Sequence, residues 1–385
     1  MTPSRILVTG STGFIGARLC ERLTVDYKLA YRALVRDFGR APRIARLAAE
    51  MVRGDIDDLE SVERALDGCD TVVHLAYSDG PQTRRLLRAC RKRGIQRFVH
   101  MSSIAVHGAN PGPESAREET APIGHYPGEE YSNMKAAAER AVQAAIRQGL
   151  RAVILRPTIV YGPYGPFVTS IVDAARERGV LTLLDEGRGV CNSVYVDDVC
   201  DAIRAAIEND RALGSAFFVT ADRAVTWREF NLAFAEMVVP SPRVVSVHSD
   251  EVRRYWASQR PTLKENLAAA GRLAASADFH RQLATVPLFG SLITGGKRIV
   301  KSVLSSDRLA TLKHLRGTPA HDGGNRDQGM AWPDMGRVTR ECLGIAFSNE
   351  RARTVLGWRP RYDLQAGAAI TRTWLEFAKA LTLDA

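Results

Sequence analysis

The sequence lacks several features that mark other classes of protein. Its six cysteines are scattered singly and form no Cys-x-x-Cys pair, which argues against a disulfide framework or structural zinc and favours a reducing compartment. The eight histidines show no metal-ligand spacing, so no metal site is predicted. The longest weakly polar stretch, near Val286–Gly296, contains a proline and three glycines, far short of the roughly 20 residues that cross a membrane. With no signal-peptide pattern, we expect a soluble, cytoplasmic protein without a transmembrane span.

Lysine is also scarce, at eight of 53 basic residues, and the formal net charge of +10 is concentrated in one segment. Residues 241–320 contain thirteen Lys or Arg against five Asp or Glu. This segment could be a solvated surface, a lid that binds an anionic substrate, or, through residues 288–301, an amphipathic contact with a membrane or partner. Nucleic-acid binding has the least support, because no interleaved aromatic residues, helix-turn-helix or zinc pattern accompany the charge.

Short apolar runs alternate with longer amphipathic segments in the first part of the chain. Strands that alternate with helices imply right-handed crossovers and a parallel sheet covered on both faces. The sequence therefore predicts an α/β fold with a Rossmann-like, doubly wound sheet. The predicted strands are Arg5–Thr9, Leu29–Val35, Met51–Arg53, Thr71–Leu75, Arg97–Met101 and Ala152–Leu155, and the predicted helices are Phe14–Leu23, Leu59–Leu66, Thr83–Arg93 and Glu129–Gln148.

The pattern changes after Arg156. Residues 225–238 are predicted to form a helix capped by Thr226, and the sequence is less regular from Pro240 to about Arg337. We expect a dinucleotide-binding domain at 1–165, to which part of 190–220 returns, and a smaller substrate-binding lobe at 166–385 with a basic insertion at about 241–337. The other predicted elements here are helices Val168–Arg178 and Val199–Glu208 and strands Leu181–Leu184, Ser193–Val196 and Ala216–Val219.

A glycine-rich turn, Thr9-Gly10-Ser11-Thr12-Gly13-Phe14-Ile15-Gly16, joins the first predicted strand to the first helix. In such a turn the glycines allow a tight bend, close approach of the backbone to a pyrophosphate, and close packing of helix on strand. The N-terminus of the helix then offers free N–H groups to the phosphates. The placement predicts a dinucleotide site.

The end of the second strand bears on which dinucleotide binds. An acidic residue there would bond the ribose hydroxyls, but the sequence has Val35-Arg36-Asp37. The Arg36 guanidinium is suited to pair with a 2′-phosphate, so NADP is preferred over NAD. Asp55, after the third strand, is a candidate for the adenine edge, with a simple turn or N-cap role as the alternative.

Hydroxyl and amine side chains follow the fifth predicted strand. Ser102 and Ser103 come directly after it, and Tyr131 and Lys135 share one face of the next helix because they are four residues apart. A ketone that accepts a hydride needs a proton partner at its oxygen, and an ammonium near a tyrosine lowers the tyrosine pKa. The pattern indicates alcohol–ketone redox chemistry.

Eight sequence motifs, taken together, resemble in order and spacing those of the extended short-chain dehydrogenases/reductases of the NAD-dependent epimerase/dehydratase family. They are TGSTGFIG, GDIDD, VVHLA, SSIAVHG, YSNMK, RPTIVYGP, VYVDDV and FSNERARTVLGWRP. The resemblance covers residues 5 to about 238 and about 346 to 376. It implies Tyr131 as general acid/base, Lys135 as its pKa modulator and ribose contact, and Ser103 as the group that orients the substrate. It also implies a homodimer.

The resemblance further implies the remaining site residues. The cofactor residues are Gly10, Thr12, Gly13, Phe14, Ile15, Gly16, Arg36, Asp55, Ile56, Leu75, Ala76, Lys135 and Pro157. The substrate residues are Tyr77, Ser78, Ser103, Thr158 and Val196. Ser102 would be structural, and His107, which replaces the family's usual Tyr, is interpreted as a packing variant rather than a catalytic group.

Departures from the family pattern narrow the reaction. Sugar 4,6-dehydratases carry Thr-Asp-Glu where this chain has Ser103-Ile104-Ala105, and without the acid pair that reaction is rejected. Nucleotide-sugar epimerases usually carry Asn and Arg where this chain has Ile159 and Cys191, which weakens a UDP-sugar assignment without excluding it.

The sequence therefore predicts an NAD(P)-dependent oxidoreductase that reduces a keto group on a small, sugar-like metabolite. The basic segment 241–320 leaves open the alternative that the substrate is anionic. The alternatives are a nucleotide-sugar epimerase with retained NAD and a transient keto intermediate, and a non-catalytic dinucleotide sensor.

Overall fold

The computed structural model describes residues 3–47, 49–108, 111–113, 119–259 and 332–381. The chain splits into two compact units, one of residues 1–252 with 331–385 and one of residues 253–330. The predicted division between residues 165 and 166 stays a prediction. Residues 288–301 and most of the basic segment 241–320 lie outside the described residues.

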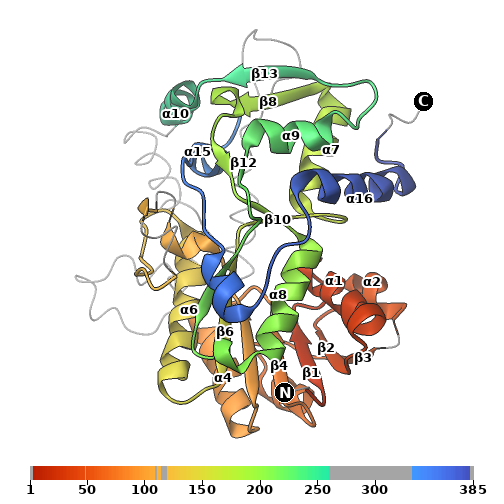
Figure 1. Ribbon diagram of the computed structural model, residues 1–385, viewed down its shortest axis with the longest axis vertical. Coiled ribbons are helices and arrows are strands. Elements are labelled where there is room, and N and C mark those ends of the chain that lie inside the picture. The colour runs from red at the N-terminus through yellow and green to blue at the C-terminus, as the bar shows by residue number, and fades with distance from the viewer. Residues whose placement is uncertain (1–2, 48, 109–110, 114–118, 260–331, 382–385) are drawn as a thin grey trace, which may run out of the picture. The chain divides into compact units, whose positions relative to one another are not determined.

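A seven-stranded sheet forms the centre of the first unit, in the order β11-β6-β5-β4-β1-β2-β3 (Figure 1). Every neighbouring pair is parallel. The predicted doubly wound sheet is confirmed, and its order reverses between β1 and β4, where open α/β sheets bind ligands. The strands are β1 (Ile6–Thr9), β2 (Tyr31–Val35), β3 (Glu50–Arg53), β4 (Thr71–His74), β5 (Arg97–Met101), β6 (Ala152–Pro157) and β11 (Ala216–Val219).

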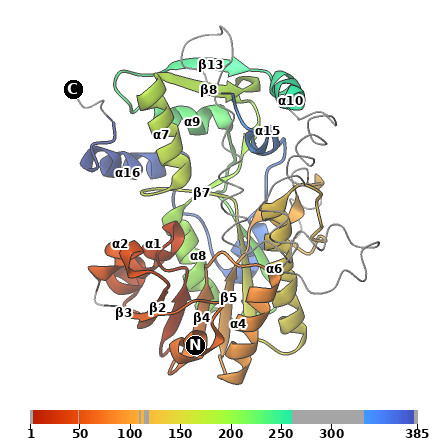
Figure 2. The ribbon, with the colours of Figure 1, turned by 180° about the vertical axis from the view of Figure 1, so that it is seen from behind.

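Alternate residues of these strands pack against two different sets of helices. Ile6 and Val8 belong to a buried cluster that includes α1 and α8, whereas Leu7 belongs to a second cluster with α3, α4 and α6. Successive side chains of a strand point to opposite faces, so both faces are covered, as Figures 1 and 2 show. The helices are α1 (Phe14–Arg22), α3 (Leu59–Leu66), α4 (Gly80–Lys92), α6 (Glu130–Arg147) and α8 (Val196–Glu208).

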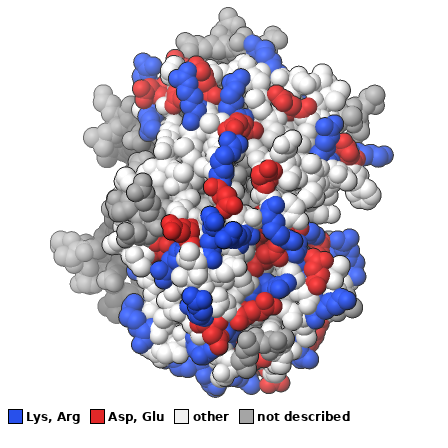
Figure 3. Space-filling model, in the orientation of Figure 1, with Lys and Arg blue, Asp and Glu red and all other residues white. Residues whose placement is uncertain are grey.

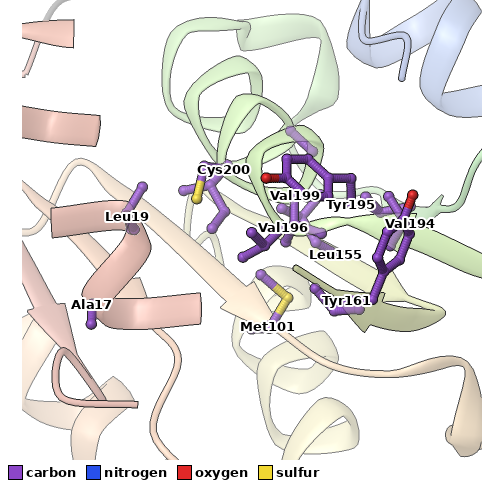
Figure 4. Close-up of a cluster of buried hydrophobic side chains, with 14 of the residues drawn as sticks. Ala17, Leu19, Met101, Leu155, Tyr161, Val194, Tyr195, Val196, Val199 and Cys200 are labelled. Carbon is purple, nitrogen blue, oxygen red and sulfur yellow. The ribbon is translucent and has the colours of Figure 1, made fainter. Parts of the chain in front are cut away.

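The first cluster links the start of α1 to the end of β5. Ala17 of α1, Met101 of β5 and Val196 of α8 are all buried in it (Figure 4). Burial stabilises such a core by about 25 cal/mol per Å² of apolar surface. Because Met101 immediately precedes Ser102 and Ser103, this core holds the serines in a fixed position relative to the glycine-rich turn.

Three small sheets and several helices complete the first unit. Strand β10 (Ser193–Tyr195) pairs in parallel with β7 (Ile159–Tyr161), and β13 (Arg243–Val247) does so with β8 (Val180–Leu184), whereas β12 (Val225–Thr226) is antiparallel to β9 (Val190–Cys191). Thr226 caps α9 in a capping box with Glu229, as predicted. The further helices are α2 (Pro42–Ala45), α7 (Pro166–Arg178), α9 (Trp227–Ala235), α15 (Met335–Glu341) and α16 (Leu364–Phe377), and α10 (Ser249–Ser258) runs into the second unit.

Two predictions about these elements were wrong in detail. The segment after Pro240 contains β13 and α10 at its start rather than irregular chain; β13 is largely exposed, and its partner β8 lies about sixty residues earlier, so local alternation did not mark it. Helix α4 begins at Gly80 rather than Thr83, because Asp79 and Gln82 form a capping box.

The charged side chains on one face of the described surface are mixed in sign. Basic and acidic groups are interspersed over the face shown in Figure 3. Among the described helices, none is both long and apolar enough to cross a membrane.

Candidate functional site

The glycine-rich turn follows β1 and leaves no space for side chains at two of its glycines. Gly10 has φ +70°, and a Cβ there would lie 2.6 Å from the backbone nitrogen of Ala76. A Cβ on Gly16 would lie 2.1 Å from the Gly10 carbonyl oxygen. Gly13 is exposed and caps α1 without a side-chain bond, so the N-terminus of α1 keeps free N–H groups for an anion. These residues fit a dinucleotide pyrophosphate.

The loops after β1 and β4 are held together by a buried chain of hydrogen bonds. The His74 ring nitrogens lie 2.7 Å from Thr9 Oγ1 and 2.9 Å from Ser78 Oγ. The Ala76 backbone N–H also donates to Thr9 Oγ1, at 3.4 Å. Burial lowers the pKa of His74 to about 3, so the ring is neutral and can donate from one nitrogen while it accepts at the other. His74 is buried and holds Leu75 and Ala76 beside Gly10.

The end of β2 carries an exposed arginine. The Arg36 side chain is 74% exposed and its Nη1 lies 3.9 Å from an Asp55 carboxyl oxygen. Asp37 accepts a hydrogen bond from the Gly39 backbone N–H, and Asp55 accepts one from Asp57. The structure therefore brings Arg36 and Asp55 together and uses Asp37 to start the next turn.

Ser103, Tyr131 and Lys135 come together at the carboxyl end of β5. Tyr131 and Lys135 project from the first turns of α6, which begins at Glu130. Burial raises the pKa of Tyr131; a hydrogen bond with the Ser103 side chain opposes this shift, and nearby Tyr77 adds to it. The buried Lys135 Nζ donates to the Met101 carbonyl oxygen, at 3.0 Å. Ser103 thus lies within bonding reach of Tyr131, and the buried Lys135 on the same helix is bonded to the last residue of β5.

Burial also sets the charge state of Lys135. Its desolvation lowers the Lys135 pKa to about 8, while the nearby Glu139 carboxylate acts in the opposite direction. Lys135 therefore loses its proton more readily than an exposed lysine does.

The residues predicted to contact substrate divide into two groups. Tyr77 is 64% exposed and stacks on Tyr131 with ring centroids 6.0 Å apart, so it lies beside the reacting groups. Ser78 is buried and lies within bonding distance of His74 and Thr83. Thr158, also buried, donates to Thr220 Oγ1.

Val196 is wholly buried at the start of α8. Its prediction as a substrate contact is corrected, because its side chain packs in the core and has no exposed surface.

Two residues of this region escaped the sequence analysis. Glu139 and Arg156 form a fully buried ion pair beside Ser102. A signal was present in the sequence, since Glu139 follows Lys135 by four residues and so lies on the same face of α6, but an acid on an Ala-rich helix is usually solvated. Ser102 and His107 both contact this pair, in agreement with the structural role expected for Ser102 and the packing interpretation of His107.

Comparison with known proteins identifies the family. Residues 6–219 match the NAD dependent epimerase/dehydratase family. The chain belongs to this family. It is accordingly an enzyme of the extended short-chain dehydrogenase/reductase type, and the resemblance seen in the sequence motifs is confirmed.

The proteins that this chain is similar to differ in reaction. A 4-hydroxy-2-methyl-3-oxo-4-farnesyl-3,4-dihydroquinoline-1-oxide ketoreductase from Stigmatella aurantiaca is 30% identical over 59% of this chain and 71% of its own length. A dTDP-glucose 4,6-dehydratase from Streptomyces niveus is 30% identical over 62% of this chain and 77% of its own. The Thermus thermophilus UDP-glucose 4-epimerase, solved in complex with NAD, is 22% identical with a TM-score of 0.60, over 97% of this chain and 99% of its own.

Within the described residues, no group of three His, Cys, Asp or Glu side chains is arranged to hold a metal ion. Four of the predicted cofactor residues carry neither acid nor hydroxyl. Phe14 and Ile15 are the first residues of α1, Pro157 is the last residue of β6, and Ile56 lies in the turn after β3.

Proposed function

We propose that the protein is an NAD(P)-dependent oxidoreductase that interconverts a secondary alcohol and a ketone. The observation that carries the proposal is that Ser103 lies against Tyr131, while Lys135, one turn further along α6, is bonded to Met101 at the end of the strand that leads to Ser103. They lie at the sheet edge that also carries the glycine-rich turn. When bound, the nicotinamide supplies or accepts the hydride.

The three side chains have separate roles in this proposal. Tyr131 delivers a proton to the substrate oxygen during reduction and takes it back during oxidation. Ser103 donates a hydrogen bond to that oxygen and so fixes its position next to Tyr131. Lys135, when protonated, supplies positive charge that favours the tyrosinate left after proton transfer.

The same proposal assigns the dinucleotide to the turn after β1. Gly10, Thr12, Gly13, Phe14, Ile15 and Gly16 would hold the pyrophosphate end, with Asp55, Ile56, Leu75, Ala76, Lys135 and Pro157 along the rest of the cofactor. The exposed Arg36 favours NADP, because its guanidinium is available at the end of β2, where Asp37 is already bonded to Gly39.

The residue after Ser103 belongs to an apolar cluster, which favours a ketone with an apolar substituent over a sugar nucleotide. Ile104, next to Ser103, packs with Leu343 and Ile345 around Phe218 and Phe347. Apolar side chains of this kind leave the hydroxyls of a sugar without partners. The family relative named as a quinoline ketoreductase acts on a ketone with an apolar chain.

The residue at the position where epimerases carry an arginine also disfavours a substrate with a nucleoside diphosphate. Here that residue is Cys191, whose side chain is fully buried in β9. Burial raises the pKa of the Cys191 thiol well above its usual value. This position therefore offers no positive charge to a substrate phosphate. Keto-sugar nucleotides are nevertheless included among the substrates tested below.

Activity on two substrate panels tests the proposal. Purified protein is incubated with NADPH or NADH and either ketones that carry alkyl or aromatic groups or keto-sugar nucleotides, and nicotinamide absorbance is followed. We expect stoichiometric oxidation of NADPH, a Tyr131→Phe variant slower by at least about 100-fold, and unchanged nucleotide binding in that variant.

Two outcomes would replace the proposal. Tightly held NAD with inversion of a nucleotide sugar and no net oxidation would make the protein an epimerase. Nucleotide binding with wild type and Tyr131→Phe equally inert on both panels would make it a dinucleotide sensor.

The same proposal includes a homodimer, by likeness to the family, and a cytoplasmic location, from the scattered single cysteines and the lack of a signal-peptide pattern. Light scattering coupled to size-exclusion chromatography would decide the first, with a mass of about twice 42.2 kDa expected. Fractionation of the source cells would decide the second.

A further inference from the structure

Behind the three proposed reacting residues lies a buried charged network that the proposed chemistry does not use. At its centre, Arg156 Nη2 lies 2.5 Å from Glu139 Oε1 and Arg156 Nε lies 3.1 Å from Glu139 Oε2. Both side chains are at most 1% exposed. A two-bonded arginine–carboxylate pair of this kind fixes geometry as well as charge.

The pair is tied to the polypeptide on both sides of Ser103. Ser102 Oγ donates to Glu139 Oε2 at 2.5 Å. Beyond Ser103, the turn Ile104–His107 ends at His107, whose Nε2 lies 3.1 Å from Arg156 Nη1. The short segment that presents Ser103 is therefore held at its two ends by one ion pair.

The pair is also tied to the helix that carries the other two groups. Glu139 lies one helical turn after Lys135 on α6 and two turns after Tyr131. Lys135 in turn donates to Met101, the residue before Ser102. Gln143, one turn further along α6, donates to Glu139 Oε1 at 3.0 Å. Strand β5 and helix α6 are thus joined at consecutive residues, Met101 and Ser102.

We propose that Glu139, held by Arg156, is a positioning residue that sets both the placement of Ser103 relative to Tyr131 and the charge on Lys135. This inference rests on the function proposed above. The placement arises through Ser102 and the charge through the carboxylate, so the two effects can be separated by mutation.

The groups around Lys135 make Glu139 the source of its stabilising charge. His74 of β4 and His100 of β5 are both close enough to Lys135 for its charge to lower their pKa values, and buried imidazoles in that state are neutral. Burial lowers the pKa of Lys135, and among these neighbours Glu139 opposes that shift. Loss of the Glu139 charge should therefore let Lys135 lose its proton at lower pH.

Two variants and a control test the inference in the full-length protein. Glu139→Gln keeps the size and removes the charge, and Ser102→Ala removes only the hydroxyl bond. Glu341→Gln is the control, because Glu341 is another buried carboxylate held by two bonds from an arginine, Arg337, on α15. For each protein, mass spectrometry measures how the modification of Lys135 by a small amine-reactive reagent depends on pH. The kcat and KM values are measured over the same pH range.

In Glu139→Gln we expect the pH midpoint of Lys135 modification to move down by about one unit. The alkaline limb of the kcat–pH profile should move down with it. We also expect kcat to fall at least about tenfold, with little change in KM. In Ser102→Ala we expect kcat to fall while the Lys135 midpoint stays in place. Glu341→Gln should leave that midpoint unchanged.

The inference is overturned if Glu139→Gln leaves the Lys135 midpoint in place, or if Ser102→Ala keeps full kcat. If Glu139→Gln does not fold, Ser102→Ala provides the test. A lower kcat at an unchanged melting temperature supports the inference, and an unchanged kcat overturns it. The labelling readout needs no turnover, so a protein that reduces no ketone refutes the proposed function while the effect of Glu139 on Lys135 is still measured.

Discussion

At the scale of single residues, the strictest requirements fall on Gly10 and Gly16. Their neighbours are backbone atoms of Leu75, Ala76 and Gly10 itself, which cannot move aside as a flexible side chain could. A glycine in such a place permits both the left-handed turn and the close approach of two loops. At Gly10, the positive φ of the turn and the close approach of Ala76 both require glycine.

Gly10→Ala is expected to abolish dinucleotide binding, because the new methyl group would force the turn away from Ala76. Gly94→Ala is the matched control: its φ is +68°, close to the +70° of Gly10, but nothing lies within 4 Å of its Cβ position. The control should lose only about 1 kcal/mol of stability and keep its affinity. Nucleotide titration by fluorescence and thermal unfolding measure both; equal affinities of the two variants would contradict the prediction.

Ser102 and Ser103 show how neighbours in sequence acquire different roles. Ser102 is buried and bonded to Glu139, whereas Ser103 is half-buried and reaches Tyr131. Successive residues at the end of a strand point in opposite directions. The strand geometry therefore commits one hydroxyl to the interior and leaves the other for the site.

At the scale of elements, a buried carboxylate joins α1 to α2. Glu21 of α1 accepts bonds from Arg43 of α2 and Arg46 just after it, as well as from Arg18 of its own helix. Burial alone would raise the pKa of Glu21, but these guanidinium groups lower it to about 2. The pair of helices next to the proposed adenosine end thus depends on one ionised acid.

Acid should therefore weaken the wild type through Glu21. A group whose pKa is lower in the folded state stabilises fully above its usual value, here 4.5, and loses that contribution as the pH falls towards 2. Glu21→Gln should be less stable than wild type at pH 7 and differ less from it at pH 2.5. Denaturant unfolding at several pH values measures this, and a stability difference that is constant with pH would refute it.

A second element contact attaches the C-terminal segment to α8. The Asp198 carboxylate accepts the backbone N–H groups of Arg361 and Tyr362, and its own carbonyl accepts the Trp358 indole N–H. Each buried donor left without an acceptor costs about 1–3 kcal/mol. This acid therefore fixes the chain just before α16.

Asp198→Ala should destabilise the protein by a few kcal/mol and speed hydrogen exchange at residues 361 and 362. The control is Asp173→Ala, which removes an exposed carboxylate that pairs with Arg176 on α7 and should cost well under about 1 kcal/mol. Hydrogen exchange followed by mass spectrometry tells them apart; unchanged exchange at residues 361 and 362 in Asp198→Ala would show that the carboxylate is not the anchor.

At the scale of the whole molecule, the central sheet, the glycine-rich turn and the proposed reacting groups all belong to the first compact unit. The second unit interrupts this one between residues 252 and 331. A unit with its own core can fold without an inserted segment. We therefore expect the first unit to fold without the insertion.

Replacement of residues 260–330 by a flexible Gly/Ser linker should leave a folded protein that binds the dinucleotide with affinity within about threefold of wild type. Turnover of the preferred ketone should change much more, because the removed segment carries most of the basic excess. Calorimetry and steady-state kinetics provide the comparison. A shortened chain that loses nucleotide binding would show that the insertion supports the first unit.

Local patterns in the sequence determined much of this protein. Alternation of apolar runs and helices predicted the parallel sheet, because each strand must be apolar on both faces. The glycine-rich turn and the four-residue spacing of Tyr131 and Lys135 predicted the site, because both depend on residues close together in the chain.

Tertiary structure alone decided what depends on distant partners. The ion pair of Glu139 with Arg156, the buried link of His74 to Thr9, and the pairing of β13 with β8 each join residues 17 to 65 positions apart. Val196, expected at the substrate, is in the core for the same reason. Burial is a property of the folded assembly, and a side chain's surroundings at such separations are fixed only when sheet and helices pack.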